Sequence, residues 1–77
     1  MTSVDLLGPE PIYQQIATVI RERIEAGVYQ PNRAIPSETA LCDEFEVSRK
    51  TAREAVRALR EAGLVRTVRG KGTYVLG

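Results

Sequence analysis

Residues 48–62 read SRKTAREAVRALREA, a stretch that predicts a helix of about four turns with an apolar side and a cationic side. Its apolar positions follow the i, i+3, i+4, i+7 spacing of a buried stripe, and they are Ala52, Ala55, Val56 and Leu59. The cations share a neighbouring arc, and they are Arg49, Lys50, Arg53, Arg57 and Arg60. Ser48 is a favourable N-cap, and Gly63 stands where a left-handed residue ends a helix.

The first turn of this helix carries positive charge at the end where helices favour acids. Arg49 and Lys50 stand there, and Arg53 follows one turn later. This arrangement gives up local stability, and it is expected where a helix end meets an anion. The alternative is a solvated basic face without a function, which is common for charge runs on helices. The remainder of the sequence distinguishes between an anion-binding helix end and a solvated basic face.

Charge is divided unevenly along the chain. Residues 1–48 carry three basic and eight acidic residues, a net charge of −5. Residues 49–77 carry eight basic and two acidic residues, a net charge of +6. Such a split indicates a polyanionic partner for the basic part, which the overall net charge of +1 conceals.

The composition argues against several classes of protein. The 77 residues suffice for one small domain, and they include no apolar run that could span a bilayer and no signal-peptide pattern. With one cysteine and no histidine, neither an internal disulfide nor a zinc site is expected, and Cys42 is predicted to pack as a small apolar group. Neither a nucleophile–base pair nor a glycine-rich phosphate loop is present. We expect a cytoplasmic protein that is not an enzyme and that uses no cofactor, metal or membrane.

The amino-terminal part predicts an arm followed by a helix. Residues 1–10 lack periodicity and are interpreted as a flexible arm, so that residues 11–77 form the domain. The helix begins with Pro11 in its first turn and ends at Gly27. Its buried stripe is predicted to be Ile12, Ile16, Val19, Ile20 and Ile24.

The connection that follows, residues 28–36, contains two prolines and is not predicted to be helical. Asn32 suits a left-handed turn position, and Tyr29 and Ile35 are expected to point inwards.

The order of the remaining elements predicts the fold class. Ser37 to Phe45 reads as a short capped helix, joined by a tight turn to the helix that begins at Ser48. Beyond Gly63 the pattern alternates, so that residues 64–68 and 73–76 are predicted strands around the basic turn RGKG. The prediction is a mainly α domain with a small β-hairpin: a winged helix-turn-helix with three helices and a two-stranded wing.

Three motifs carry a resemblance to a known family. IPSE (35–38), VSRKTAREA (47–55) and RGKGTYV (69–75) occur in this order and spacing. Together they resemble the DNA-binding domain of the GntR family of bacterial transcription regulators, with the closest likeness to its HutC-type branch. The resemblance covers about residues 11–76. The chain departs from the family pattern at Asn32 and Glu46, where glycine is common, and Glu46 would be strained if its turn requires a positive φ.

The resemblance implies that the start of the third helix enters the major groove of DNA. The residues it implicates there are Ser48, Arg49, Lys50, Thr51 and Arg53. Arg49 and Arg53 are the candidates for reading guanine, because the guanidinium fork matches its O6 and N7 atoms. The hydroxyls of Ser48 and Thr51 suit phosphate oxygens at a helix end, while Lys50 suits phosphate or base.

The resemblance also places the wing tip, Arg69, Gly70 and Lys71, in the adjacent minor groove. Gly70 would allow close approach of the backbone, although turn geometry alone is an equal alternative. Ser37 is expected to contact a phosphate as well as to cap its helix. By contrast, Arg57 is expected to pair with Glu61 or Glu54, and Arg60 lies beyond the turns that can reach bases.

The implied partner is a double-stranded DNA operator with two-fold symmetry, bound by a regulator that acts as a repressor. Family members dimerise and bind a small-molecule effector through a C-terminal domain, so that the full-length protein is expected to be a homodimer and this fragment a monomer. The alternative function is a winged helix that binds an acidic protein partner. The four aromatic side chains are too scattered for a base-stacking platform, which disfavours single-stranded nucleic acid.

Overall fold

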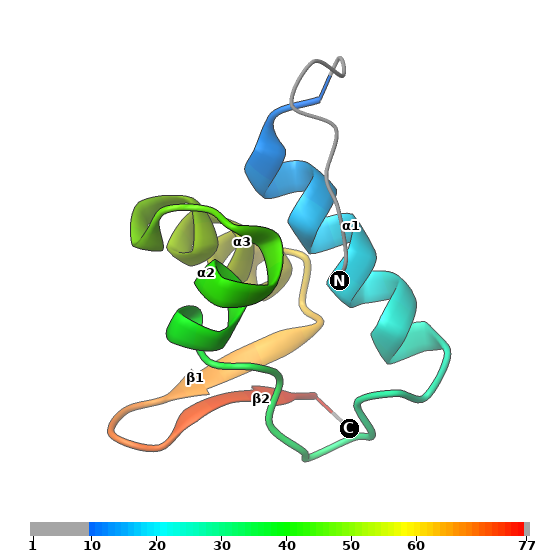
Figure 1. Cartoon of the computed structure of the whole chain (residues 1–77). Coiled ribbons are helices and arrows are strands. Elements are labelled where there is room, and N and C mark those ends of the chain that lie inside the picture. Colours follow the sequence, from blue (N-terminus) through cyan, green and yellow to red (C-terminus); the bar gives the residue numbers. More distant parts are fainter. Residues whose placement is uncertain (1–9, 77) are drawn as a thin grey trace.

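The computed structural model describes residues 10–76, so the predicted arm lies outside the described residues apart from its last member, the exposed Glu10. The elements follow one another as predicted (Figure 1), and they are α1 (Ile12–Glu25), α2 (Glu38–Phe45), α3 (Arg49–Glu61), β1 (Val65–Val68) and β2 (Gly72–Val75). Three helices pack together, and the two-stranded hairpin projects beside them as the wing. The predicted winged helix-turn-helix is confirmed.

The start of α1 differs slightly from the prediction, and its end agrees with it. Pro11 occupies the N-cap position, one residue before the helix begins, rather than the first helical turn. At the other end Gly27 adopts the left-handed conformation with a φ of 82°, and the Val28 N–H donates to the Arg23 carbonyl at 2.8 Å. These bonds satisfy carbonyls that the last turn would otherwise leave unpaired.

Side-chain caps begin both helices of the helix-turn-helix. The Ser37 hydroxyl accepts a hydrogen bond from the Ala40 N–H at 3.1 Å. In α3 the Ser48 hydroxyl accepts from the Thr51 N–H at 3.2 Å. Both predicted N-caps are therefore confirmed, and each satisfies one amide of its first turn.

The turn between α2 and α3 depends on a left-handed residue. Glu46 adopts φ 56° and ψ 50°, and the Val47 N–H donates to the Cys42 carbonyl at 3.2 Å. This turn therefore does require the positive φ that the sequence suggested. Asn32 is also left-handed, with a φ of 66°.

The connection after α1 pairs with the wing, which the sequence did not predict. β1 and β2 pair antiparallel, with Val65 opposite Val75 and Val68 opposite Gly72. The connection after α1 runs along the other edge of β2, where the Asn32 N–H donates to the Val75 carbonyl at 2.8 Å and the Ile35 N–H to the Thr73 carbonyl at 2.9 Å. The base of the wing is thereby fixed to the segment that leads into α2.

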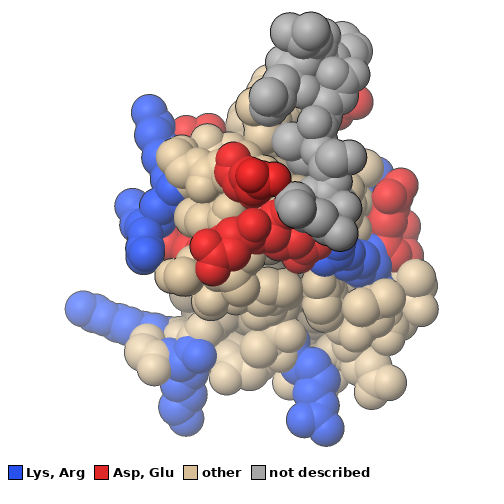
Figure 2. Space-filling model, viewed as in Figure 1, with Lys and Arg blue, Asp and Glu red and all other residues tan. Residues whose placement is uncertain are grey.

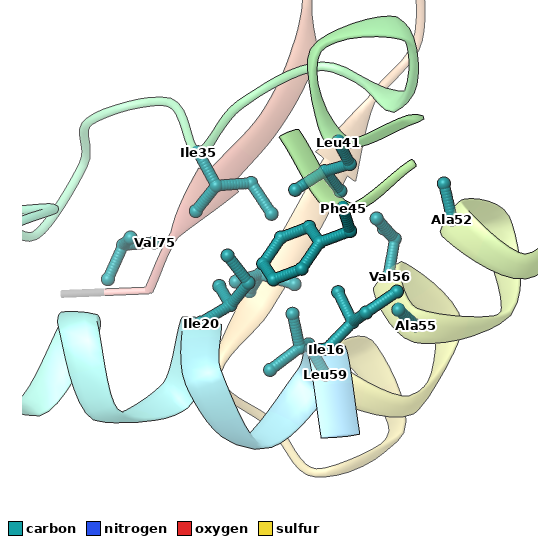
Figure 3. Packing of buried hydrophobic residues seen from close by; sticks show 11 residues of the cluster. Ile16, Ile20, Ile35, Leu41, Phe45, Ala52, Ala55, Val56, Leu59 and Val75 are labelled. Carbon is teal, nitrogen blue, oxygen red and sulfur yellow. The ribbon is translucent and has the colours of Figure 1, made fainter. Parts of the chain in front are cut away.

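The core lies between the three helices and the inner face of the wing. Figure 3 shows Phe45 of α2 pointing toward α1 and α3. The fully buried side chains include Ile16 and Ile20 of α1, while Ala52 and Ala55 present small side chains where α3 packs. The rest of the predicted α1 stripe is partly buried and packs against the core, as does Cys42. Ile35 is buried as predicted and Tyr29 is half-buried.

One arginine fastens α1 to α2. The Arg23 guanidinium forms an ion pair with Glu44, donates to the Tyr29 hydroxyl at 2.9 Å and lies over the Phe45 ring, 5.8 Å from its centre. The hydrogen bond with the Glu44 carboxylate raises the pKa of Arg23 above its ordinary value. Among residues 10–76, no helix has the length and apolar character needed to cross a membrane.

Candidate nucleic-acid interface

Cations gather along one edge of the molecule. Figure 2 shows Lys and Arg side chains projecting at the start of α3 and from the wing, whereas Asp and Glu side chains lie over α2 and on α1. The uneven charge along the sequence thus becomes an uneven charge in space. An edge of this kind attracts polyanions.

The start of α3 presents its polar groups to solvent. Ser48, Arg49 and Lys50 are exposed and Thr51 is half-buried. Besides capping the helix, the Ser48 hydroxyl donates to the Thr51 hydroxyl oxygen at 3.1 Å. The helix end therefore carries two adjacent hydroxyls, free amides of its first turn and two exposed cations, a combination suited to anions.

Both arginines that are candidates for base reading lie against the first turn of α2. Arg49 Nη2 donates to Thr39 Oγ1 at 3.2 Å. Arg53 contacts the Glu38 carboxylate through two long bonds, from Nε at 3.4 Å and from Nη2 at 3.5 Å. The Arg53 side chain remains 66% exposed, so this pair is weak and solvent-screened. The sequence did not predict that α2 would hold these side chains.

The wing tip is an exposed turn. Arg69, Gly70 and Lys71 are all exposed, and the Lys71 N–H donates to the Val68 carbonyl at 3.0 Å. Gly70 has a φ of 78°, and a Cβ built there would meet nothing within 4 Å. Turn geometry therefore accounts for this glycine by itself, and open space remains around it for a ligand.

A groove of 520 Å³ separates the two helices from the wing. On one side it is lined by Pro36, Ser37, Glu38, Thr39, Arg49 and Val56, and on the other by Thr67, Val68, Arg69, Gly70, Lys71, Gly72 and Thr73. It thus brings together five of the nine predicted site residues: Ser37, Arg49, Arg69, Gly70 and Lys71. The other four, Ser48, Lys50, Thr51 and Arg53, lie outside its lining at the start of α3.

The inner face of the wing carries polar groups that the sequence analysis missed. Arg60 Nη1 donates to Thr67 Oγ1 at 3.0 Å, and Thr67 Oγ1 lies 3.3 Å from Thr73 Oγ1 across the strand pair. Register alone could have predicted the threonine pair, because the two residues are equally distant from the turn. Arg57 pairs with Glu61 at 3.4 Å, as predicted, and does not line the groove.

Comparison with known proteins identifies the family of this chain. The family model described as "Bacterial regulatory proteins, gntR family" matches residues 12–75. The chain belongs to this family.

Relatives of this gntR-family chain include named repressors. It is 48% identical over 69 residues to the mannosyl-D-glycerate transport/metabolism system repressor MngR of Escherichia coli K12, covering 90% of this chain and 29% of the repressor. It is 40% identical over 68 residues to the histidine utilization repressor of Klebsiella aerogenes, covering 88% of this chain and 27% of that protein. The predicted HutC-like affiliation is confirmed, and the family is one of regulators rather than of enzymes.

Solved structures of gntR-family domains have the same fold. The AraR DNA-binding domain in complex with operator ORX1 is 35% identical, with a TM-score of 0.89 over 97% of this chain and 95% of that one. The chain spans less than a third of the length of the two repressors named above.

Among residues 10–76, no group of His, Cys, Asp and Glu side chains could hold a metal ion.

Proposed function

We propose that this chain is the operator-binding domain of a bacterial transcription regulator that acts as a repressor. In this proposal α3 enters the major groove of duplex DNA and the wing enters the adjacent minor groove. The observation that carries the proposal is the cationic groove between the helix ends and the wing, in a chain of the gntR family. A major groove about 12 Å wide admits a helix, and the neighbouring minor groove begins across one phosphodiester strand.

The groove is where that shared strand would lie. Ser37 at the start of α2 stands on one side and the Thr67–Thr73 pair on the other, so that hydroxyls face the strand from both sides. Hydroxyls and helix N-termini are common donors to phosphate oxygens. Arg69, Gly70 and Lys71 would then continue past the strand into the minor groove.

Base reading is assigned to Arg49 and Arg53. Their present bonds to Thr39 and Glu38 are 3.2 to 3.5 Å long, which leaves both side chains able to turn toward guanine. Lys50 would contact phosphate or base. Ser48 and Thr51 would bind a phosphate at the helix end, where the dipole adds to their hydrogen bonds.

The whole protein is proposed to be longer than this chain, since its relatives are. A homodimer formed through another domain would place two copies of α3 on a two-fold symmetric operator, and a small effector would bind outside this chain. Operator binding implies action in the cytoplasm. The isolated domain is expected to be monomeric.

The test begins with selection of a preferred site from a random duplex library. Affinity for that site and for random DNA is then measured at several salt concentrations, for the wild type and for Arg49→Ala. Because each neutralised phosphate contributes about −0.9 to the slope, log affinity should fall linearly with log salt. Arg49→Ala should cost about 1–3 kcal/mol on the selected site and relax one base position.

Arg57→Ala is the matched control, because it removes an arginine from the same helix that is already paired with Glu61. It should change affinity by less than about twofold. Absence of duplex binding at low salt would refute the proposal, and binding to an acidic polypeptide instead would favour the protein-partner alternative. Equal loss on both DNAs for Arg49→Ala would remove its base-reading role.

A further inference from the structure

The two faces of the wing differ in what they contact. Val65 and Val75 are buried in the core and Thr67 contacts Arg60, so these alternate positions face α3. The residues between them in β1 and β2 face the other way. There the structure has a second hollow, of 310 Å³, lined by Asn32, Arg66, Val68, Lys71 and Tyr74. We call these five residues the outer wing face.

This face is cationic and has no acid in its lining. The stretch from Leu64 to Leu76 contains Arg66, Arg69 and Lys71 and no Asp or Glu. Within residues 10–76, neither Arg66 nor Lys71 has an ion-pair partner. Figure 2 shows Lys and Arg side chains projecting from the lower edge of the molecule with no Asp or Glu beside them in that view.

The outer wing face also offers a directional donor. Tyr74 stands opposite Arg66 in the strand register and is half-buried, which holds its ring in place. Its hydroxyl has no hydrogen-bond partner in the described part of the chain. Tyrosine hydroxyls and arginines both donate to phosphate oxygens, so the pair suits a phosphate group.

A wing in a minor groove lies between two phosphodiester strands, because the groove is only about 6 Å wide. The inner face meets the strand shared with the major groove. We propose that the outer wing face binds the far strand of the same minor groove, with Arg66, Lys71 and the Tyr74 hydroxyl contacting its phosphates. Lys71 lines both hollows and so joins the two surfaces. This inference rests on the proposed function and extends the contact to a strand beyond the groove beside α3.

The test compares two versions of the selected operator duplex. One is unmodified, and the other has neutral methylphosphonate linkages at the far-strand positions of the wing's minor groove. On the unmodified duplex, Arg66→Ala should weaken binding about three- to tenfold and reduce the salt slope by about 0.9. Tyr74→Phe, which keeps the packing, should weaken binding about twofold to fivefold. On the neutral duplex Arg66→Ala should bind as the wild type does.

Arg21→Ala is the control, because Arg21 is an exposed arginine of α1 that lines neither hollow of the wing. If Arg66→Ala and Arg21→Ala bind alike on the unmodified duplex, or if Arg66→Ala loses equally on both duplexes, the inference is overturned. Wild-type binding in that same experiment would leave the proposed function standing. Failure of the wild type to bind either duplex would overturn both. Matching circular dichroism and thermal unfolding would establish that the variants are folded.

Discussion

Glu46 has a left-handed backbone conformation that is unfavourable for a residue with a side chain. It holds a φ of 56° at the end of α2 and is exposed, and its side chain has no hydrogen-bond or ion-pair partner in the described residues. A left-handed backbone is disfavoured for residues with a Cβ by about 1–2 kcal/mol. The helix-turn-helix nevertheless requires that conformation to direct the chain from α2 into Ser48.

We therefore predict that Glu46→Gly stabilises the domain. Part of the gain is offset by the greater freedom of glycine in the unfolded chain, so that the net increase should be about 1 kcal/mol. For a domain of this size that corresponds to a rise of about 4–8 °C in the midpoint of thermal unfolding. Asn32→Gly is the matched control, since asparagine tolerates its φ of 66° and should gain much less. A loss of stability in Glu46→Gly would show that the carboxylate has a structural role.

At the scale of elements, α2 holds the arginines of α3. The Glu38 carboxylate lies 3.4 Å from Arg53 Nε, and Thr39 accepts from Arg49 at 3.2 Å. The first turn of α2 thus sets the positions of the two guanidinium groups in the domain without DNA. An exposed pair of this kind contributes little to stability, so its effect should appear in binding.

We predict that Glu38→Gln separates affinity from specificity. Removing a negative charge beside the groove should strengthen binding to random DNA, by about twofold to fivefold at low salt. Arg53 would lose its charged partner, so the base assigned to it in the proposed complex should be less strictly selected. Affinities for the selected site and for single-base variants of it, compared with random DNA, measure both effects. If affinity for every duplex falls instead, Glu38 itself contacts DNA.

The sequence predicted elements well and contacts between elements poorly. The stripe of α3 and the caps Ser37 and Ser48 could be predicted because their signals are local, lying within one or two helical turns. The pairing of Asn32 and Ile35 with β2 could not, because it depends on where α1 leaves the connection in space. For the same reason the contacts of Arg53 with Glu38 and of Arg60 with Thr67 were missed, since only tertiary packing brings those side chains together.

At the scale of the whole molecule, the separation of charge orients the protein as it approaches a polyanion. The edge formed by α3 and the wing is cationic, and acids collect over α2 (Figure 2). Near a polyanion such a molecule experiences a torque as well as an attraction, so it approaches with the cationic edge forward. Asp43 is an exposed acidic residue of α2 and lines neither hollow of the wing.

We predict that Asp43→Lys acts on association and leaves recognition unchanged. The substitution raises the net charge by two away from the groove, so at low salt the association rate should rise about threefold on the selected site and on random DNA alike. The ratio of the two affinities and the dissociation rate from the selected site should stay as in the wild type, because no contact to DNA has changed. Above about 0.5 M salt the difference should disappear through screening. Stopped-flow association over a salt series measures this, and a changed affinity ratio would mean that α2 approaches the DNA more closely than the groove geometry implies.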